Sequence, residues 1–328
     1  MMSDSSRAPV GPRELLIERV LAFVSGRPAD EVRRVEQRLG EVLDRAGKDA
    51  VDALMLRLAT TGADWSFYPA DTLAQRIQEA VAEVSLPPGS NMTGIAELAE
   101  VRDRPIVFLP NHLSYSDANV FALLLRRAGF DSVADRLSVI VGPKVYSDPI
   151  RRFFSLYFGT VKTPQSSARS SEDAVMSARD VAKLARETIA TAYDRQTKGD
   201  ALVVFVEGTR SRSGAMQRAL PAVARYLEHP GAVLVPVGIC GSEEFVPVDD
   251  LRAHATSVSV AMGRPAEAAR LEAAAQGNRR RMMDAVGIAI ARLLPPEYGG
   301  VYADGDATLD DARAVANAVF GSRAGAQR

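Results

Sequence analysis

The chain has 328 residues, of which 47% are hydrophobic, and its basic and acidic side chains nearly balance at a formal net charge of −1. A chain of this length and apolar content can bury a substantial core, so an intrinsically disordered or fibrous protein is excluded. The balanced charge argues against a nucleic-acid binder that depends on many phosphate contacts, so any anion site must be local.

Cysteine and histidine are too scarce for a disulfide framework or a structural zinc site. The single cysteine is Cys240, and the histidines are His112, His229 and His254. We therefore expect a reducing, cytoplasmic location and no bound metal. The N-terminus is not typical of a signal peptide, and no segment approaches the roughly 18 uninterrupted apolar residues of a membrane span.

The first 88 residues predict a small all-helical domain. Between about residues 12 and 85 the apolar residues recur at helical spacing, and glycine and proline divide this stretch into about four helices. The last of these, residues 70–84, ends just before Pro87, Pro88 and Gly89. We place the domain boundary there, with the second domain beginning at residue 89.

Residues 89–300 predict an α/β domain, because short apolar runs alternate with longer helical stretches. The expected strands are residues 105–109, 137–141, 201–206, 232–239 and 257–262. The expected helices are residues 118–128, 148–156, 172–197, 219–227 and 279–294. The last helix has a basic start and an apolar body, and we expect it to face the core. Residues 301–328 form a C-terminal tail with a short helix over residues 309–320.

The first candidate for chemistry is the loop Asn111-His112-Leu113-Ser114-Tyr115-Ser116-Asp117, which directly follows the predicted strand 105–109. Ligand and catalytic sites of α/β proteins collect at strand ends. His112 can accept a proton at neutral pH, and Asp117 is placed to bond its other ring nitrogen and fix its orientation. The loop therefore predicts a His–Asp general base. The alternative is that Asp117 only caps the following helix and His112 is a structural histidine.

The second candidate is the segment Glu207-Gly208-Thr209-Arg210-Ser211-Arg212-Ser213-Gly214, which follows the predicted strand 201–206. Gly208 permits a sharp turn with a positive φ. Arg210 and Arg212 alternate with hydroxyl side chains, and their planar bidentate donors match a phosphate monoester. Glu207 is a candidate acceptor for substrate hydroxyl groups, or it orders the loop by pairing with an arginine. The alternative for the whole segment is a solvated basic loop.

Both candidate loops follow strands of one domain. If the two strands are parallel neighbours, their carboxyl ends lie at the same edge of the sheet, and the base stands beside the arginines. The segment is not a P-loop, because no Gly-Lys-Ser/Thr follows at the required spacing.

The two segments NHLSYSD and FVEGTRSRSG resemble the first and third signature blocks of the glycerol-3-phosphate and lysophosphatidate acyltransferase superfamily, the histidine-four-residues-aspartate enzymes. The segment VGPKVYSDPIRRFFSLYFGTVK resembles the second block, and Val235-Pro236-Val237-Gly238 resembles the fourth. All four occur in family order over about residues 105–263. With a helical domain ahead of them, the chain is most similar to the soluble plastid type of glycerol-3-phosphate acyltransferase.

The resemblance implies a mixed central sheet flanked by helices and an O-acyltransferase of phospholipid biosynthesis. The fatty acyl group moves from an acyl thioester, acyl-CoA or acyl carrier protein, to a hydroxyl of glycerol 3-phosphate or 1-acylglycerol 3-phosphate. His112 removes the proton from that hydroxyl while Asp117 holds the ring. No cofactor is implied besides the acyl donor, and the partners implied are the donor, the phosphorylated acceptor and a peripheral contact with the inner membrane surface.

The resemblance places substrate-binding residues in the second and third blocks. The third block contributes Glu207, Gly208, Thr209, Arg210 and Arg212, and the second contributes Lys144, Arg151 and Lys162. The apolar residues of the second block are either walls for the acyl chain or simple core: Phe153, Phe154, Leu156, Tyr157 and Phe158. We expect the helical domain to act as a scaffold or to dock the donor carrier, with no side chain between Leu15 and Val84 in the pocket of His112.

Several alternatives remain at this stage. The same chemistry fits a different hydroxyl acceptor, such as a lyso-aminolipid or a secondary metabolite. A serine hydrolase lacks the Gly-x-Ser-x-Gly elbow and would have to use Ser114 or Ser116. A metal hydrolase lacks a further histidine cluster. A non-catalytic lipid-binding protein would not need both the His–Asp pair and the arginine loop.

Overall fold

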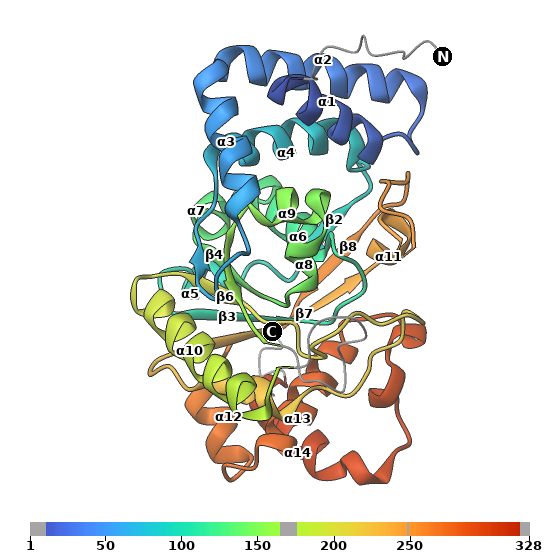
Figure 1. Ribbon diagram of the computed structural model, residues 1–328. Helices are drawn as coiled ribbons and strands as arrows, with labels where there is room; N and C mark the ends of the chain where they lie inside the picture. The colour runs from blue at the N-terminus through green and yellow to red at the C-terminus, as the bar shows by residue number, and fades with distance from the viewer. Residues whose placement is uncertain (1–10, 165–175, 248, 322–328) are drawn as a thin grey trace, which may run out of the picture.

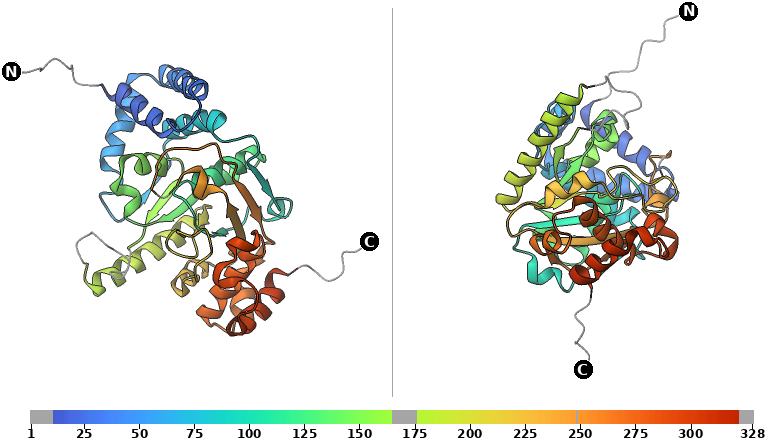
Figure 2. Two further views of the ribbon diagram at one scale, coloured as in Figure 1. Left: turned by 90° about the vertical axis from the view of Figure 1, so that its right-hand side faces the viewer. Right: turned by 90° about the horizontal axis from the view of Figure 1, so that it is seen from below.

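The computed structural model describes residues 11–164, 176–247 and 249–321. The chain is arranged in three tiers (Figure 1). The N-terminal helices lie at the top of this view, the sheet and its covering helices lie in the middle, and the C-terminal helices lie at the bottom. The left view of Figure 2 shows the same three tiers from the side.

The described residues form one nine-stranded mixed sheet. The strand order is β1-β5-β4-β6-β3-β7-β8-β2, and β9 pairs with β7. The five central strands of this order, from β5 to β7, run parallel to one another. Strand β1 pairs antiparallel with β5, and both β8 and β9 pair antiparallel with β7. The strands are β1 (Phe67–Tyr68), β2 (Asn91–Thr93), β3 (Ile106–Pro110), β4 (Leu137–Val141), β5 (Gly159–Lys162), β6 (Ala201–Val203), β7 (Val233–Cys240), β8 (Ser259–Met262) and β9 (Ala266–Glu267).

Helices cover both faces of this sheet. The α-helices are α1 (Pro12–Phe23), α2 (Ala29–Ala46), α3 (Lys48–Thr60), α4 (Thr72–Ser85), α5 (Leu98–Val101), α6 (Asp117–Arg127), α7 (Asp131–Ala134), α8 (Lys144–Ser147), α9 (Pro149–Ser155), α10 (Ala178–Thr197), α11 (Ser242–Phe245), α12 (Ala268–Ala274), α13 (Arg279–Ala291) and α14 (Asp310–Phe320). Short 3-10 helices span Pro221–Leu227, Pro296–Tyr298, Gly300–Tyr302 and Ala307–Leu309.

The central strands are apolar at every position because both of their faces are buried. On β3, Ile106 and Phe108 belong to one core, while Val107 and Leu109 belong to the core on the opposite face. Successive side chains of a strand point to opposite faces, so a continuous apolar run indicates helices on both sides. The first core packs against α6, and the second packs against α13. The position of α13 confirms the expectation that this helix faces the core.

The N-terminal helices bury one apolar stripe each. On α2 the buried residues Val35, Leu39 and Leu43 recur at a spacing of four, which places them on one face of the helix. These residues share a core with α1, α3 and α4, and also with Phe153 and Leu156 of the second domain. The helical tier therefore packs directly on the α/β domain.

The expected helical region and α/β sheet are confirmed, with additions that the sequence did not indicate. The two-residue strand β1 lies within the helical region and pairs antiparallel with β5. Strands β2, β5 and β9 were also not expected, because each is short and two of them lie at the margin of the sheet. The expected helix over residues 219–227 is the 3-10 helix Pro221–Leu227. Residues 172–175, expected to begin a helix, lie outside the described residues, as do residues 322–328 of the tail.

The domain boundary near residue 88 stays a prediction. It falls in the turn between α4 and β2. Within the described part of the chain, no helix is both long enough and apolar enough to span a membrane.

Candidate active site

The two candidate loops lie side by side at the carboxyl edge of the sheet. Strands β3 and β6 are parallel neighbours, with Phe108 opposite Val203, so the segments that follow them leave the sheet at the same edge. The backbone N–H of Ser211 donates a hydrogen bond of 2.7 Å to the carbonyl oxygen of His112. The expectation that parallel strands bring the two loops together is confirmed.

His112 and Asp117 form a hydrogen-bonded pair. The distance from His112 Nδ1 to Asp117 Oδ2 is 2.8 Å. The carboxylate only accepts hydrogen bonds, so Nδ1 carries the proton and Nε2 is the basic nitrogen. His112 is 17% exposed and lines a cavity, whereas Asp117 is completely buried. The pair therefore has the geometry of a base with an orienting carboxylate.

Asp117 also holds the loop together. Its Oδ2 accepts hydrogen bonds from the backbone N–H groups of Leu113 at 2.7 Å and Ser114 at 3.0 Å, and its Oδ1 accepts one of 2.5 Å from Ser242 Oγ. These donors precede α6 or come from α11. The carboxylate is therefore directed back at the loop of His112, which differs from the simple helix cap considered above.

The ring of His112 has an aromatic neighbour, and the strand end that carries it is anchored to β7. It stacks on Phe205, with the ring centroids 4.0 Å apart and an angle of 25° between the planes. The neighbouring Asn111 is fully buried and exchanges two hydrogen bonds with the backbone of Ile239 on β7, at 2.9 and 2.7 Å. These contacts fix the end of β3 and the plane of the imidazole before any substrate binds.

Glu207 lies beneath the second loop. It is 1% exposed, and its two carboxylate oxygens accept the backbone N–H groups of His112 at 2.9 Å and Gln217 at 2.7 Å. Burial raises the pKa of Glu207 to about 7. Its expected role as a substrate ligand is corrected, because it faces the backbone of both loops and is not part of the described cavity wall. Through these backbone donors it orders both loops.

Two arginines converge on Tyr115. The guanidinium carbon of Arg210 lies 3.6 Å from the centroid of the Tyr115 ring, and that of Arg151 lies 4.6 Å from it. All three residues line the cavity with His112. Arg210 Nη1 and Arg151 Nε are buried without a hydrogen-bond partner among the described residues. Buried guanidinium donors without partners are costly, and an anion is the kind of ligand that could satisfy them.

The other expected ligands fall into two groups. Gly208, Thr209, Arg212 and Lys144 line the cavity, and Gly208 has the expected positive φ of 66°. Lys162 does not fit its expected place in the positive pocket. Its Nζ donates a hydrogen bond of 2.7 Å to the carbonyl oxygen of Gly62 and lies 4.4 Å from the ring centroid of Trp65. It is held by the connection between α3 and β1, away from the described cavity wall.

The cavity has a volume of about 520 Å³ and mostly apolar walls. The N-terminal helices contribute to these walls through Phe23 of α1 and Gln78, Val81 and Ala82 of α4. The expectation that no side chain between Leu15 and Val84 lines the pocket is therefore wrong. The reason is that α4 packs against α6 and α9.

A polar contact fixes this packing between the two domains. Asn119 Nδ2, in the first turn of α6, donates a hydrogen bond of 2.8 Å to Gln78 Oε1 of α4. Gln78 Nε2 in turn donates one of 3.1 Å to the carbonyl oxygen of Phe153 in α9. Helical periodicity in the sequence does not show which later helix α4 will meet.

The apolar residues of the second block divide between cavity and core. Phe154 and Phe158 line the cavity. Phe153 and Leu156 are buried in the core of the helical tier, and Tyr157 is fully buried with its hydroxyl near Arg126. The core interpretation therefore holds for four of the five residues, because Phe158 is also buried in the core on the α6 face of the sheet.

Four residues of the site were missed in the sequence: Asn111, Tyr115, Phe205 and Ser242. Each acts through a partner far away in the chain, and no local spacing signals it. One indication of a role in the site is present in the sequence: Asn111, Tyr115 and Phe205 lie next to a candidate strand end.

The two serines of the hydrolase alternative are placed differently, because Ser116 lines the cavity with His112 and Ser114 does not. Ser114 is fully buried, and its Oγ donates a hydrogen bond of 2.7 Å to the carbonyl oxygen of Val246, so it is not placed as a nucleophile. The described residues contain no cluster of three or more metal-ligating side chains.

Comparison with known families gives a direct result. Residues 90–240 match the model of the family described as Acyltransferase. This segment, a little less than half of the chain, therefore belongs to the acyltransferase family. Both motif loops of this acyltransferase lie within the matched segment, and α1 to α4 lie ahead of it. The narrower likeness to the plastid type stays a prediction.

The comparisons with solved structures and with curated proteins give weaker results. Among solved structures it is similar to the 1-acyl-sn-glycerophosphate (LPA) acyltransferase PlsC from Thermotoga maritima. The two are 18% identical, and the alignment covers 78% of this chain and 86% of that chain with a TM-score of 0.41. No curated protein matches the sequence.

Proposed function

We propose that the protein transfers a fatty acyl group from an acyl thioester to a hydroxyl of a phosphorylated glycerol. The observation that carries this proposal is the placement of the His112–Asp117 pair beside Arg151 and Arg210 in one largely apolar cavity. A base, an anion site and an apolar wall are what a hydroxyl acceptor with a phosphate and a fatty acyl chain require.

In the proposed mechanism His112 Nε2 removes the proton from the acceptor hydroxyl. The oxygen attacks the thioester carbonyl, the carbon–sulfur bond breaks as the tetrahedral intermediate collapses, and the thiolate takes up the proton held by His112. Asp117 stabilises the imidazolium through its hydrogen bond to Nδ1. The mechanism uses no covalent acyl-enzyme, metal or cofactor, and the acyl thioester is a co-substrate.

The extent of the apolar walls favours an acceptor that already carries an acyl chain. Val139 and Phe158 belong to the core on the α6 face of the sheet, whereas Val204 and Val223 belong to the core on the opposite face, and all four line the cavity. Two apolar regions on opposite faces provide for two chains, one on the donor and one on the acceptor. Within the proposal, 1-acylglycerol 3-phosphate is therefore favoured over glycerol 3-phosphate.

The second candidate is the same chemistry on an acceptor without a phosphate, such as a lyso-aminolipid or a hydroxylated secondary metabolite. A carboxylate acceptor would also fit the arginines. We further propose that the enzyme is cytoplasmic and meets its lipid substrates at the inner membrane surface, with acyl-CoA or acyl carrier protein as donor.

Mass spectrometry of the products tests the proposal. The purified protein is incubated with acyl-CoA or acyl carrier protein and with each acceptor in turn: glycerol 3-phosphate, 1-acylglycerol 3-phosphate, glycerol and monoacylglycerol. We expect phosphatidate as the main product, and no product from the folded His112→Ala variant. Equal turnover of phosphorylated and unphosphorylated acceptors would reject the phosphate and support the second candidate. Turnover of glycerol 3-phosphate alone would reject the acylated acceptor.

A further inference from the structure

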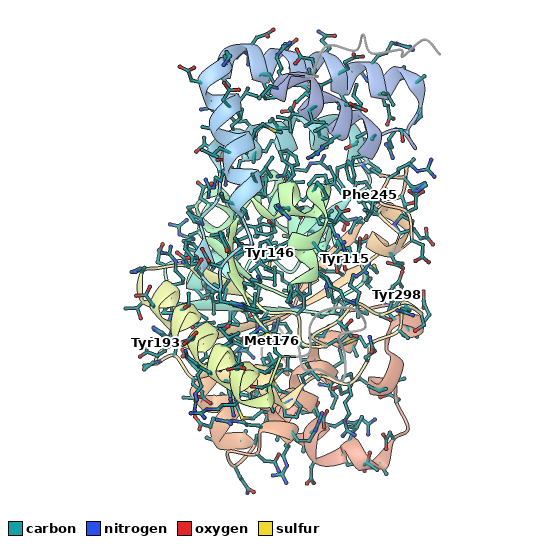
Figure 3. All side chains as sticks on the ribbon, viewed as in Figure 1. Tyr115, Tyr146, Met176, Tyr193, Phe245 and Tyr298 are labelled. Carbon is teal, nitrogen blue, oxygen red and sulfur yellow. The ribbon has the colours of Figure 1, made fainter. Side chains whose placement is uncertain are left out.

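The contact between Tyr115 and the two arginines is a feature that general-base chemistry does not require. Tyr115 lies in the loop between His112 and Asp117, whereas Arg151 comes from α9 and Arg210 from the loop after β6. Figure 3 shows Tyr115 at mid-height in the molecule, between the upper and lower helical tiers. One aromatic ring thus joins three separate segments of the site.

Two like charges share this ring. The guanidinium carbons of Arg210 and Arg151 lie 3.6 and 4.6 Å from the same ring centroid, so the two cations are close neighbours. Arg151 has Asp148 at 3.8 Å, and the bonds of Asp117 are taken up by His112, Leu113, Ser114 and Ser242. The electron-rich face of a tyrosine ring attracts a guanidinium group and offsets part of the repulsion between two such groups.

The two arginines have N–H donors without a hydrogen-bond partner in the part of the chain that the structure describes. Arg210 Nη1 and Arg151 Nε are both buried and have no hydrogen-bond partner among the described residues. A side chain that stacks both guanidinium groups on one ring restricts their orientation while it leaves Arg210 Nη1 for a ligand, whereas Arg151 Nε lies 3.8 Å from Asp148 Oδ1. Because Tyr115 is three residues from His112, it also sets the distance between that ligand and the base.

We infer that Tyr115 is a positioning residue, whose ring holds Arg151 and Arg210 in register with His112 for the phosphate of the acceptor. The inference rests on the proposed function for the identity of the ligand, a phosphate monoester. It assigns the effect to the aromatic ring of Tyr115, which both guanidinium groups contact.

The test compares ligand binding with and without the ring. Calorimetric titration with glycerol 3-phosphate is carried out on the wild type and on the variants Tyr115→Phe and Tyr115→Leu. The matched control is Tyr193→Leu, since Tyr193 is 45% exposed on α10 and lies at the outer edge of the molecule in Figure 3. We expect Tyr115→Leu to weaken binding about tenfold, and Tyr115→Phe and Tyr193→Leu to stay within about twofold of the wild type.

Steady-state kinetics provides the second measurement. Tyr115→Leu should raise the KM for the phosphorylated acceptor about tenfold with little change in the KM for the acyl donor, and Tyr115→Phe should restore it. Should the leucine variant fail to fold, Tyr115→Met replaces it, because a flexible apolar side chain fills the site without a ring.

Three results would overturn the inference. The first is binding by folded Tyr115→Leu within twofold of the wild type. The second is an equal loss in Tyr115→Phe, which would assign the effect to the hydroxyl. The third is a wild type that binds neither glycerol 3-phosphate nor inorganic phosphate. A wild type that binds glycerol 3-phosphate through Tyr115 but transfers no acyl group would instead uphold the inference and reject the proposed function.

Discussion

Replacement of Asp117 by asparagine should separate the structural and catalytic roles of this carboxylate. Asp117 Oδ2 faces three donors, Nδ1 of His112 and the N–H groups of Leu113 and Ser114, while Oδ1 faces the hydroxyl of Ser242. An asparagine has one side-chain oxygen. This oxygen must take the place of Oδ2 and face the three donors, because an amide NH₂ in that place would face donors only. The NH₂ group then faces Ser242, whose hydroxyl can turn to accept.

The Asp117→Asn variant should therefore fold with His112 in the same tautomer. What it loses is the negative charge that stabilises the imidazolium. A charge-assisted hydrogen bond contributes about 1.5–3 kcal/mol, which corresponds to a loss of about 10- to 150-fold in kcat. Asp117→Ala should be worse in stability, because it leaves all four donors buried without a partner at about 1–3 kcal/mol each.

The assay measures thiol release from acyl-CoA at saturating acceptor, together with the thermal midpoint of each variant. We expect Asp117→Asn to lose kcat with a midpoint close to that of the wild type, and Asp117→Ala to lose both. Ser242→Ala is the matched control, since it removes one bond to Asp117 without changing its charge. A kcat of Asp117→Asn within about threefold of the wild type would refute the argument from charge.

Three further predictions follow from other parts of the site. Removal of the guanidinium in Arg210→Ala should raise the KM for the phosphorylated acceptor ten- to a hundredfold. Arg210→Lys should not restore the KM, because an ammonium group cannot make a planar two-bond contact. Unchanged kinetics in both variants would exclude an anion-binding role for Arg210. Burial raises the pKa of Glu207 to about 7, so the folded state binds this proton more tightly than the unfolded state. The contribution of protonated Glu207 to the free energy of unfolding therefore falls as the pH rises from about 4.5 to about 7, by up to about 1.4 kcal/mol per pH unit. Urea unfolding at pH 5 and pH 7.5 should show a smaller pH difference for Glu207→Gln than for the wild type, and an equal difference would contradict the raised pKa. Ala82 of α4 lines the cavity, so Ala82→Phe should lower kcat/KM for long-chain acyl-CoA by about fourfold for each methylene excluded. The kcat/KM for a short-chain acyl-CoA should stay the same. Equal losses for all chain lengths would show that the acyl chain does not bind beside Ala82.

The sequence by itself determined the parts of this protein that depend on neighbouring residues. The apolar run of β3 predicts a strand buried on both faces, and the spacing of His112 and Asp117 predicts a hydrogen-bonded pair, because a loop and the first turn of a helix bring them together. The positive φ of Gly208 is likewise a local property of the turn after β6. The alignment of the two loops also follows from sequence, once β3 and β6 are taken as parallel neighbours.

Only the tertiary structure decided which distant residues complete the site. Lys162 and Arg151 are both basic residues of the second block, yet the fold directs Lys162 to the carbonyl oxygen of Gly62 and Arg151 to the ring of Tyr115. In the same way α4 forms a wall of the cavity because Gln78 meets Asn119, 41 residues further along the chain. The physical reason is that periodicity and spacing report which face of an element is apolar, whereas the partner of that face is set by the packing of the whole chain.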